Sequence, residues 1–121
     1  ETKLAKNFKL KELMRIENGQ WGIFSPEALV RIQNMRNSLG VPLYVNSAFR
    51  SPGYNAGVDE AALYSRHQYG DAVDVTTQGA TSLNQIKSAC EAEDANFIKL
   101  YATHVHCDWR QLKLSSIFWQ K

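Results

Sequence analysis

Two short segments alternate between polar and apolar residues, and this alternation constrains the fold more than any other feature of the chain. In DAVDV, residues 71–75, Asp74 stands between Val73 and Val75, and in THVHCDW, residues 103–109, histidines alternate with apolar residues. Successive side chains of a β-strand point to opposite faces of a sheet. Each segment therefore predicts a strand with one apolar face against a core and one face that carries ionisable groups.

The same alternation predicts which ionisable side chains share a face. Asp74 points away from the core in the first strand, and His104, His106 and Asp108 share one face of the second. A buried carboxylate without a partner costs on the order of several kcal/mol or becomes protonated, whereas a divalent cation would compensate its charge. The pattern suggests a metal site, although an H-x-H pair on a strand is also compatible with two half-exposed histidines.

Length and charge limit the class of protein. The 121 residues are expected to form a single domain over residues 1–121. The formal net charge is only +2 and basic residues are scattered among acidic ones, so we expect no nucleic-acid partner. No window approaches the roughly 20 apolar residues of a membrane span, and the N-terminal residues lack the apolar region of a signal peptide. Because the chain begins with Glu rather than Met, we expect a trimmed or mature form.

Sequence signals predict two helices and four strands. A helix is expected over residues 24–40, between Ser25 as its N-cap and Gly40 as the glycine that ends it. A second helix is expected over residues 82–93, where S-x-x-Q forms a capping box. Strands are expected over residues 43–48, 70–77, 96–101 and 103–109. This order predicts an α+β domain with a mainly antiparallel sheet and helices packed on it.

The remaining segments carry weaker signals. Residues 8–14 predict a short amphipathic turn, the glycines around Trp21 predict a loop, and residues 114–121 predict a packed C-terminal segment. Residues 50–66 contain Pro, Gly and Asn and predict a long surface loop. Loops of that length inside a compact domain are usually functional.

The two cysteines, Cys90 and Cys107, are too few for a disulfide scaffold and lack the C-x-x-C spacing of a zinc or redox pair. We expect two buried small hydrophobic residues. One falls in a predicted helix and the other in a predicted strand, so the sequence leaves a bridge between them open.

The motifs around these strands resemble a known superfamily. The pattern S-x-H-x-x-G-x-A-x-D over residues 65–74, followed by H-x-H over residues 104–106, resembles the zinc peptidases of the D-alanyl-D-alanine carboxypeptidase and lysostaphin (LAS) superfamily. SAFRSPGYN, residues 47–55, is similar to a stretch of its carboxypeptidase and phage-endolysin branch. The resemblance covers residues 45–109 with the motifs in order. It implies the hedgehog/DD-peptidase fold and hydrolysis of amide bonds in peptidoglycan stem peptides.

The resemblance also implies the metal ligands. His67, Asp74 and His106 would hold one zinc ion, and Arg50 would be the cation that grips the substrate, at a developing oxyanion or at a peptide carboxylate. Two imidazole nitrogens and one carboxylate oxygen leave the fourth tetrahedral position of zinc open to water, which is typical of catalytic rather than structural sites. Ser65 and Tyr54 are further candidates for substrate contact.

The general base is where the sequence departs from the family pattern. Many relatives carry a glutamate three residues before the last histidine ligand, and this position is Thr103 here. His104 is the first candidate for the base, because histidine suits proton transfer near neutral pH. Asp108 is the second candidate, and it would equally suit an outer carboxylate that orients His106 through the other ring nitrogen.

The resemblance leaves several properties open. The reaction is either removal of a terminal D-alanine, as in carboxypeptidases, or cleavage of an internal bond, as in the phage L-alanyl-D-glutamate endopeptidases. A monomer that acts on peptidoglycan or muropeptides, either outside the cytoplasm or encoded by a phage, is expected. The alternative is a non-catalytic zinc-containing module for peptidoglycan binding or signalling, as in the hedgehog domain, which would tolerate loss of His104 and Arg50.

Overall fold

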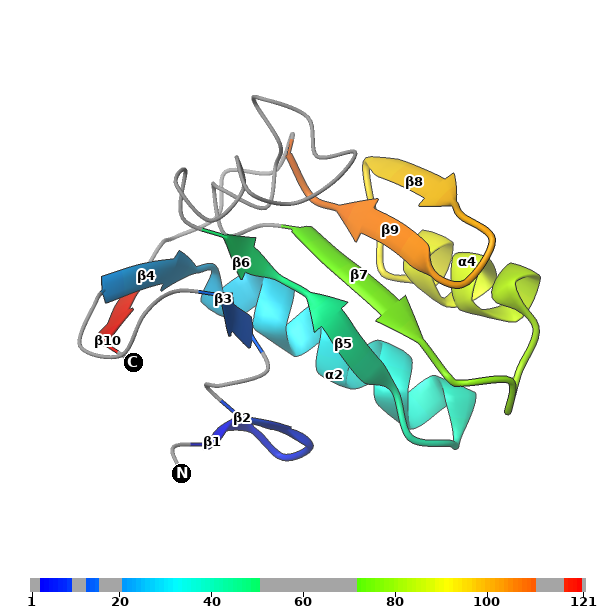
Figure 1. Ribbon diagram of the computed structural model, residues 1–121, viewed down its shortest axis with the longest axis horizontal. Helices are drawn as coiled ribbons and strands as arrows, with labels where there is room; N and C mark the ends of the chain where they lie inside the picture. The colour runs from blue at the N-terminus through cyan, green and yellow to red at the C-terminus, as the bar shows by residue number, and fades with distance from the viewer. Residues whose placement is uncertain (1–2, 10–12, 16–20, 51–71, 111–116, 121) are drawn as a thin grey trace.

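The computed structural model describes residues 3–9, 13–15, 21–50, 72–110 and 117–120 of the chain. At its centre is a four-stranded antiparallel sheet with the strand order β5-β7-β9-β8. Its strands are β5 (Tyr44–Ser47), β7 (Ala72–Thr76), β8 (Phe97–Leu100) and β9 (Val105–Asp108). Helices α2 (Pro26–Leu39) and α4 (Leu83–Ala92) lie behind this sheet in Figure 1. The expected α+β class, with a mainly antiparallel sheet and packed helices, is confirmed.

Three two-stranded pairs accompany the central sheet. They are β1 (Lys3–Ala5) with β2 (Phe8–Lys9), β4 (Trp21–Phe24) with β10 (Ile117–Gln120), and β3 (Met14–Arg15) with β6 (Phe49–Arg50). The first two pairs are antiparallel and the third is parallel.

One of the weaker sequence predictions is wrong, and another is described only in part. The loop expected around Trp21 is wrong, because Trp21 begins β4 and pairs with Gln120 of β10. The short amphipathic turn expected over residues 8–14 is described only in part: Leu13 is helical, strands lie at both ends, and residues 10–12 lie outside the described residues. At Trp21 a strand partner distant in the sequence, rather than the local pattern, determines the backbone conformation.

Helix α2 begins and ends where its capping residues predict. The Ser25 hydroxyl accepts a hydrogen bond from the amide of Ala28 at 3.3 Å. At the other end Gly40 adopts a φ of 70°, a left-handed conformation that glycine tolerates, and donates its N–H to the carbonyl of Arg36 at 3.3 Å. The buried side of α2 comprises Ala28, Leu29, Ile32 and Met35.

Helix α4 opens with the predicted capping box. The Ser82 hydroxyl accepts from the amide of Gln85 at 3.1 Å, and the Gln85 side chain accepts from the amide of Ser82 at 2.9 Å. Ile86, Ala89 and Cys90 form its buried side. Both predicted helices are thus confirmed.

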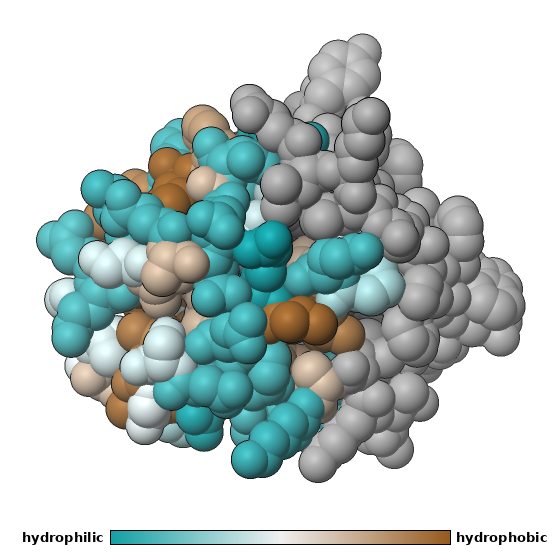
Figure 2. Space-filling model, turned by 180° about the vertical axis from the view of Figure 1, so that it is seen from behind, coloured by the Kyte–Doolittle hydropathy of each residue, from teal (hydrophilic) through white to brown (hydrophobic). Residues whose placement is uncertain are grey.

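The core lies between the helices and the apolar face of the sheet. Val73, Val75, Val105 and Cys107 of β7 and β9 are fully buried in one hydrophobic cluster with α2 and α4. Seen from behind in Figure 2, the described part of the opposite, helical side is largely hydrophilic with scattered hydrophobic residues. Because alternate side chains of a strand point to opposite faces, the residues between these core positions lie on the other face of the sheet.

The two cysteines are both buried and both free thiols. Burial, together with neighbouring Cys90, raises the pKa of Cys107 well above its ordinary value. They contribute to the core as small apolar side chains. Within the described residues, no helix has the length and apolar character needed to cross a membrane.

Candidate metal and catalytic site

The register of the sheet places Asp74 directly beside His106. These two residues are partners in the β7–β9 ladder, and Asp108 is the partner of Ala72 in the same ladder. Side chains of directly paired residues in antiparallel strands point to the same face. Nδ1 of His106 lies 3.0 Å from Oδ1 of Asp74, so the two strands present a nitrogen and an oxygen donor together.

A second carboxylate holds the opposite side of the His106 ring. Nε2 of His106 lies 2.8 Å from Oδ2 of Asp108. Asp108 is fully buried, and the side chains of His106 and Asp74 are only 11% and 15% exposed. The imidazole is therefore held between two carboxylates in a site that is largely withdrawn from water.

Arg110 neutralises the buried carboxylate of Asp108. Its Nε donates to Oδ1 at 2.8 Å and its Nη2 donates to Oδ2 at 2.6 Å, which is a bidentate ion pair. The backbone N–H of Arg110 also donates to Oδ1 at 3.3 Å. Asp74, His106, Asp108 and Arg110 thus form a continuous chain of hydrogen-bonding contacts.

These neighbours shift the pKa values of His106 and Asp108. Burial by itself lowers the pKa of His106, but hydrogen bonds and charge from Asp108 and Asp74 outweigh burial and raise it from 6.5 to about 9. For Asp108, burial raises the pKa, whereas the hydrogen bonds from Arg110 and His106 lower it from 3.8 to about 2.

Phe97 also contacts the ring of His106. It is the ladder partner of Asp108 in β8, so it faces the same side of the sheet. Its ring meets that of His106 edge to face, with centroids 5.8 Å apart and an interplanar angle of 71°. The guanidinium carbon of Arg110 lies 4.5 Å from the centroid of Phe97. No sequence motif pointed to Phe97 or Arg110.

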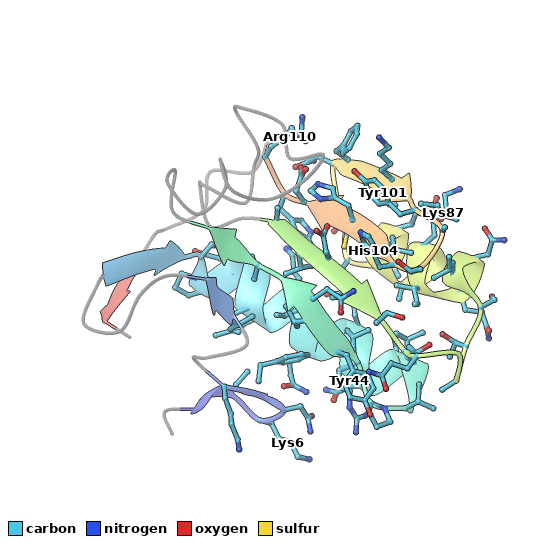
Figure 3. All side chains as sticks on the ribbon, viewed as in Figure 1. Lys6, Tyr44, Lys87, Tyr101, His104 and Arg110 are labelled. Atoms are coloured by element: carbon cyan, nitrogen blue, oxygen red, sulfur yellow. The ribbon has the colours of Figure 1, made fainter. Side chains whose placement is uncertain are left out.

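His104 lies at the other end of β9 from Arg110, in the turn that joins β8 to β9 (Figure 3). Its carbonyl accepts from the amide of Tyr101 at 2.9 Å, and its ring stacks on that of Tyr101 with centroids 4.6 Å apart. Nδ1 of His104 lies 3.0 Å from Oγ1 of Thr103, the residue at the family's glutamate position. His104 is thus positioned by the turn and precedes the first residue of the strand.

Four of the predicted site residues are not described in full. His67, Ser65 and Tyr54 lie outside the described residues, so their roles stay predictions. Arg50 ends β6 beside Arg15 of β3, and only its backbone is described. The structure therefore brings together Asp74, His106 and Asp108 from the predicted set.

The described residues contain no group of three or more His, Cys, Asp or Glu side chains arranged to hold a metal ion. Asp74, His106 and Asp108 do not converge, because the two carboxylates meet opposite nitrogens of the ring. The Asp74–His106 pair nevertheless fits zinc: tetrahedral bonds of 2.0–2.1 Å place two donor atoms about 3.3 Å apart. The observed 3.0 Å separation of Nδ1 and Oδ1 is close to that value. Because catalytic zinc sites have three protein ligands, a zinc ion bound here would need one further ligand.

Comparison with known proteins identifies the class. The model of the family described as Peptidase M15 matches residues 6–108, and the chain belongs to this family. It is therefore a peptidase by family, and the resemblance drawn from its motifs is confirmed. Peptidases of this family are generally zinc-dependent.

Among solved structures, the chain is similar to the L-Ala D-Glu endopeptidase ChiX of Serratia marcescens. The sequence identity is 20% and the TM-score is 0.49, over 70% of this chain and 79% of ChiX. No curated protein matches the chain.

Proposed function

We propose that residues 1–121 form one zinc peptidase domain that hydrolyses amide bonds in peptidoglycan stem peptides. The observation that carries the proposal is the Asp74–His106 pair, with donor atoms 3.0 Å apart on the polar face of the sheet, in a chain of the M15 family. The proposed domain is a monomer that holds one zinc ion.

His67, Asp74 and His106 are the proposed ligands. His106 would bind through Nδ1, since its Nε2 faces Asp108. His67 precedes Asp74 by seven residues, a spacing long enough for the chain to return to the same site. When bound, zinc supplies Lewis acidity that activates a water molecule and polarises the scissile carbonyl.

The two candidates for the general base differ in their surroundings. Both oxygens of Asp108 already accept hydrogen bonds, from His106 and Arg110, and the residue is fully buried. Such a carboxylate suits a positioning role better than proton transfer. His104 is partly exposed, and its Nδ1 faces Thr103, so an Nδ1–H that donates to the threonine oxygen would leave Nε2 free to accept a proton. We therefore propose His104 as the base.

Incubation of the zinc-loaded chain with purified muropeptides, followed by mass measurement of the products, tests the proposed function. Loss of a single alanine would indicate a carboxypeptidase, and a stem peptide divided in two would indicate an endopeptidase. Muropeptides that remain intact while binding the chain would contradict hydrolysis and favour the non-catalytic module. The zinc-free chain, restored by added zinc, is the control for metal dependence.

Replacement of Arg50 by alanine is expected to lower kcat/KM by about 10²-fold with metal binding retained. A fixed guanidinium that meets charge developing on the substrate contributes about this much to catalysis. Steady-state kinetics with muropeptides measures the effect, and Arg36→Ala on α2 is the matched control. A loss confined to KM would contradict the transition-state role and show instead that Arg50 only binds substrate.

A further inference from the structure

Among the described residues, Asp108 and Phe97 contact the His106 ring, and Arg110 contacts both of them. We propose that Arg110, acting through Asp108, and Phe97 are positioning residues that fix the orientation of His106 for metal binding. The inference rests on the proposed function, in which His106 is a ligand. Arg110 lies beyond residues 6–108, the part of the chain that the family model matches, so nothing in the family match assigns it.

The first step is the ion pair between Arg110 and Asp108. Because the guanidinium is planar and donates two nearly parallel hydrogen bonds, it fixes the plane of the carboxylate as well as its position. Oδ2 of Asp108 accepts a hydrogen bond from Nη2 of Arg110 at 2.6 Å. The same oxygen lies 2.8 Å from Nε2 of His106. The oxygen that meets the imidazole is therefore held in place by the arginine.

The second step is the contact of Phe97 with both partners. The χ2 torsion of histidine is soft, so a single hydrogen bond leaves the imidazole ring free to rock. Phe97 meets the His106 ring edge to face, and Arg110 lies over the Phe97 ring at 4.5 Å. The contacts thus form a ring of four side chains, each touching the next: His106, Asp108, Arg110 and Phe97.

The consequence is a fixed direction for Nδ1 of His106. With Nε2 held by Asp108, Nδ1 points to the carboxylate of Asp74 at 3.0 Å, where the metal would bind. Residues that orient a metal-binding histidine through its other nitrogen usually change metal affinity by about 10- to 100-fold when they are replaced. Arg110 lies one contact further out but determines the position of the carboxylate that does this.

Metal affinity of the Arg110→Met variant tests the inference. Methionine keeps part of the apolar side chain of arginine and removes the guanidinium that donates both hydrogen bonds to Asp108. We expect Zn²⁺ and Co²⁺ affinity, measured by competition with a chromophoric chelator, to fall by about 10- to 100-fold. The visible absorption of the Co²⁺-loaded chain should also change, because ligand geometry changes. Arg110→Lys keeps the positive charge that Arg110→Met removes but cannot donate two parallel hydrogen bonds, so it should recover only part of the affinity.

Arg36→Met on α2 is the matched control and should bind both metals as the wild-type chain does. Wild-type affinity and an unchanged Co²⁺ spectrum in Arg110→Met would overturn the inference. If Arg110→Met does not fold, as judged by circular dichroism, Phe97→Leu decides: weaker metal affinity supports the inference and wild-type affinity overturns it.

A readout without metal separates this inference from the proposed function. In the metal-free chain, NMR contacts between the ring protons of His106 and Phe97 should be present in the wild type and lost in Arg110→Met. If the wild-type chain bound neither metal but showed this difference, the ligand assignment would fail and the positioning of the ring would stand. If the contacts persisted in the variant, the positioning role would be refuted.

Discussion

The His67→Ala variant is expected to lose both metal binding and hydrolysis. Of the three proposed ligands, His67 is the one that neither β7 nor β9 supplies, and its removal leaves only the Asp74–His106 pair. Four-ligand zinc sites bind with roughly 10–16 kcal/mol, or about 3 kcal/mol per ligand. Loss of one ligand therefore weakens binding by at least about 10²-fold. Metal content after dialysis and the rate of muropeptide cleavage measure the two effects.

The neighbouring Gln68→Ala substitution is the matched control, because it changes the same segment without removing a nitrogen ligand. It should retain zinc and activity. His106→Ala should reproduce the loss seen in His67→Ala, since the proposal gives both residues the same role. Wild-type zinc content in His67→Ala together with loss in His106→Ala would show that the third ligand is another residue.

The polar face of the sheet could be predicted because alternation is a local property of a strand. Once DAVDV and HVHCD were assigned to strands, it followed that Asp74 lies on the face opposite Val73 and Val75, and that His106 and Asp108 share a face. Which residue stands opposite Asp74 depends on the register between β7 and β9, which the local pattern does not contain. The structure supplies this register and pairs Asp74 with His106.

Side-chain contacts and strand pairings that the local pattern does not contain account for what the sequence did not predict. Arg110 follows β9 and is one of 14 basic residues in the chain. Only the structure shows that its guanidinium forms a bidentate ion pair with the buried Asp108. Phe97 becomes a neighbour of His106 only through the β8–β9 pairing. Trp21 stands between glycines that suggest a loop, yet the far end of the chain pairs with it as a strand.

His104 is an intermediate case. The alternation predicted that it shares a face with His106, but β9 begins at Val105, one residue later. Its ring is instead fixed by the β8–β9 turn, through stacking on Tyr101 and contact with Thr103. A position just outside the strand leaves the ring partly exposed, whereas His106 is held between two carboxylates.

The His104→Ala variant is expected to reduce turnover by about 10²-fold or more while zinc binding stays at the wild-type level. A positioned general base typically contributes 10²–10⁴-fold to the rate, and His104 is not one of the proposed ligands. Single-turnover cleavage of muropeptides measures the chemical step, and competition with a chelator measures zinc affinity. Tyr101→Phe is the matched control, because it keeps the stacked ring and removes only the hydroxyl, and its turnover should be unchanged.

The Asp108→Asn variant distinguishes between His104 and Asp108 as the general base. Because Asp108 bonds both Arg110 and Nε2 of His106, its replacement is expected to weaken zinc binding together with turnover. Loss of a general base lowers turnover and leaves zinc binding intact, whereas loss of a residue that positions a zinc ligand lowers both. Two results together would contradict this assignment: unchanged turnover in His104→Ala, and lost turnover with retained zinc in Asp108→Asn. They would show that Asp108, not His104, is the general base.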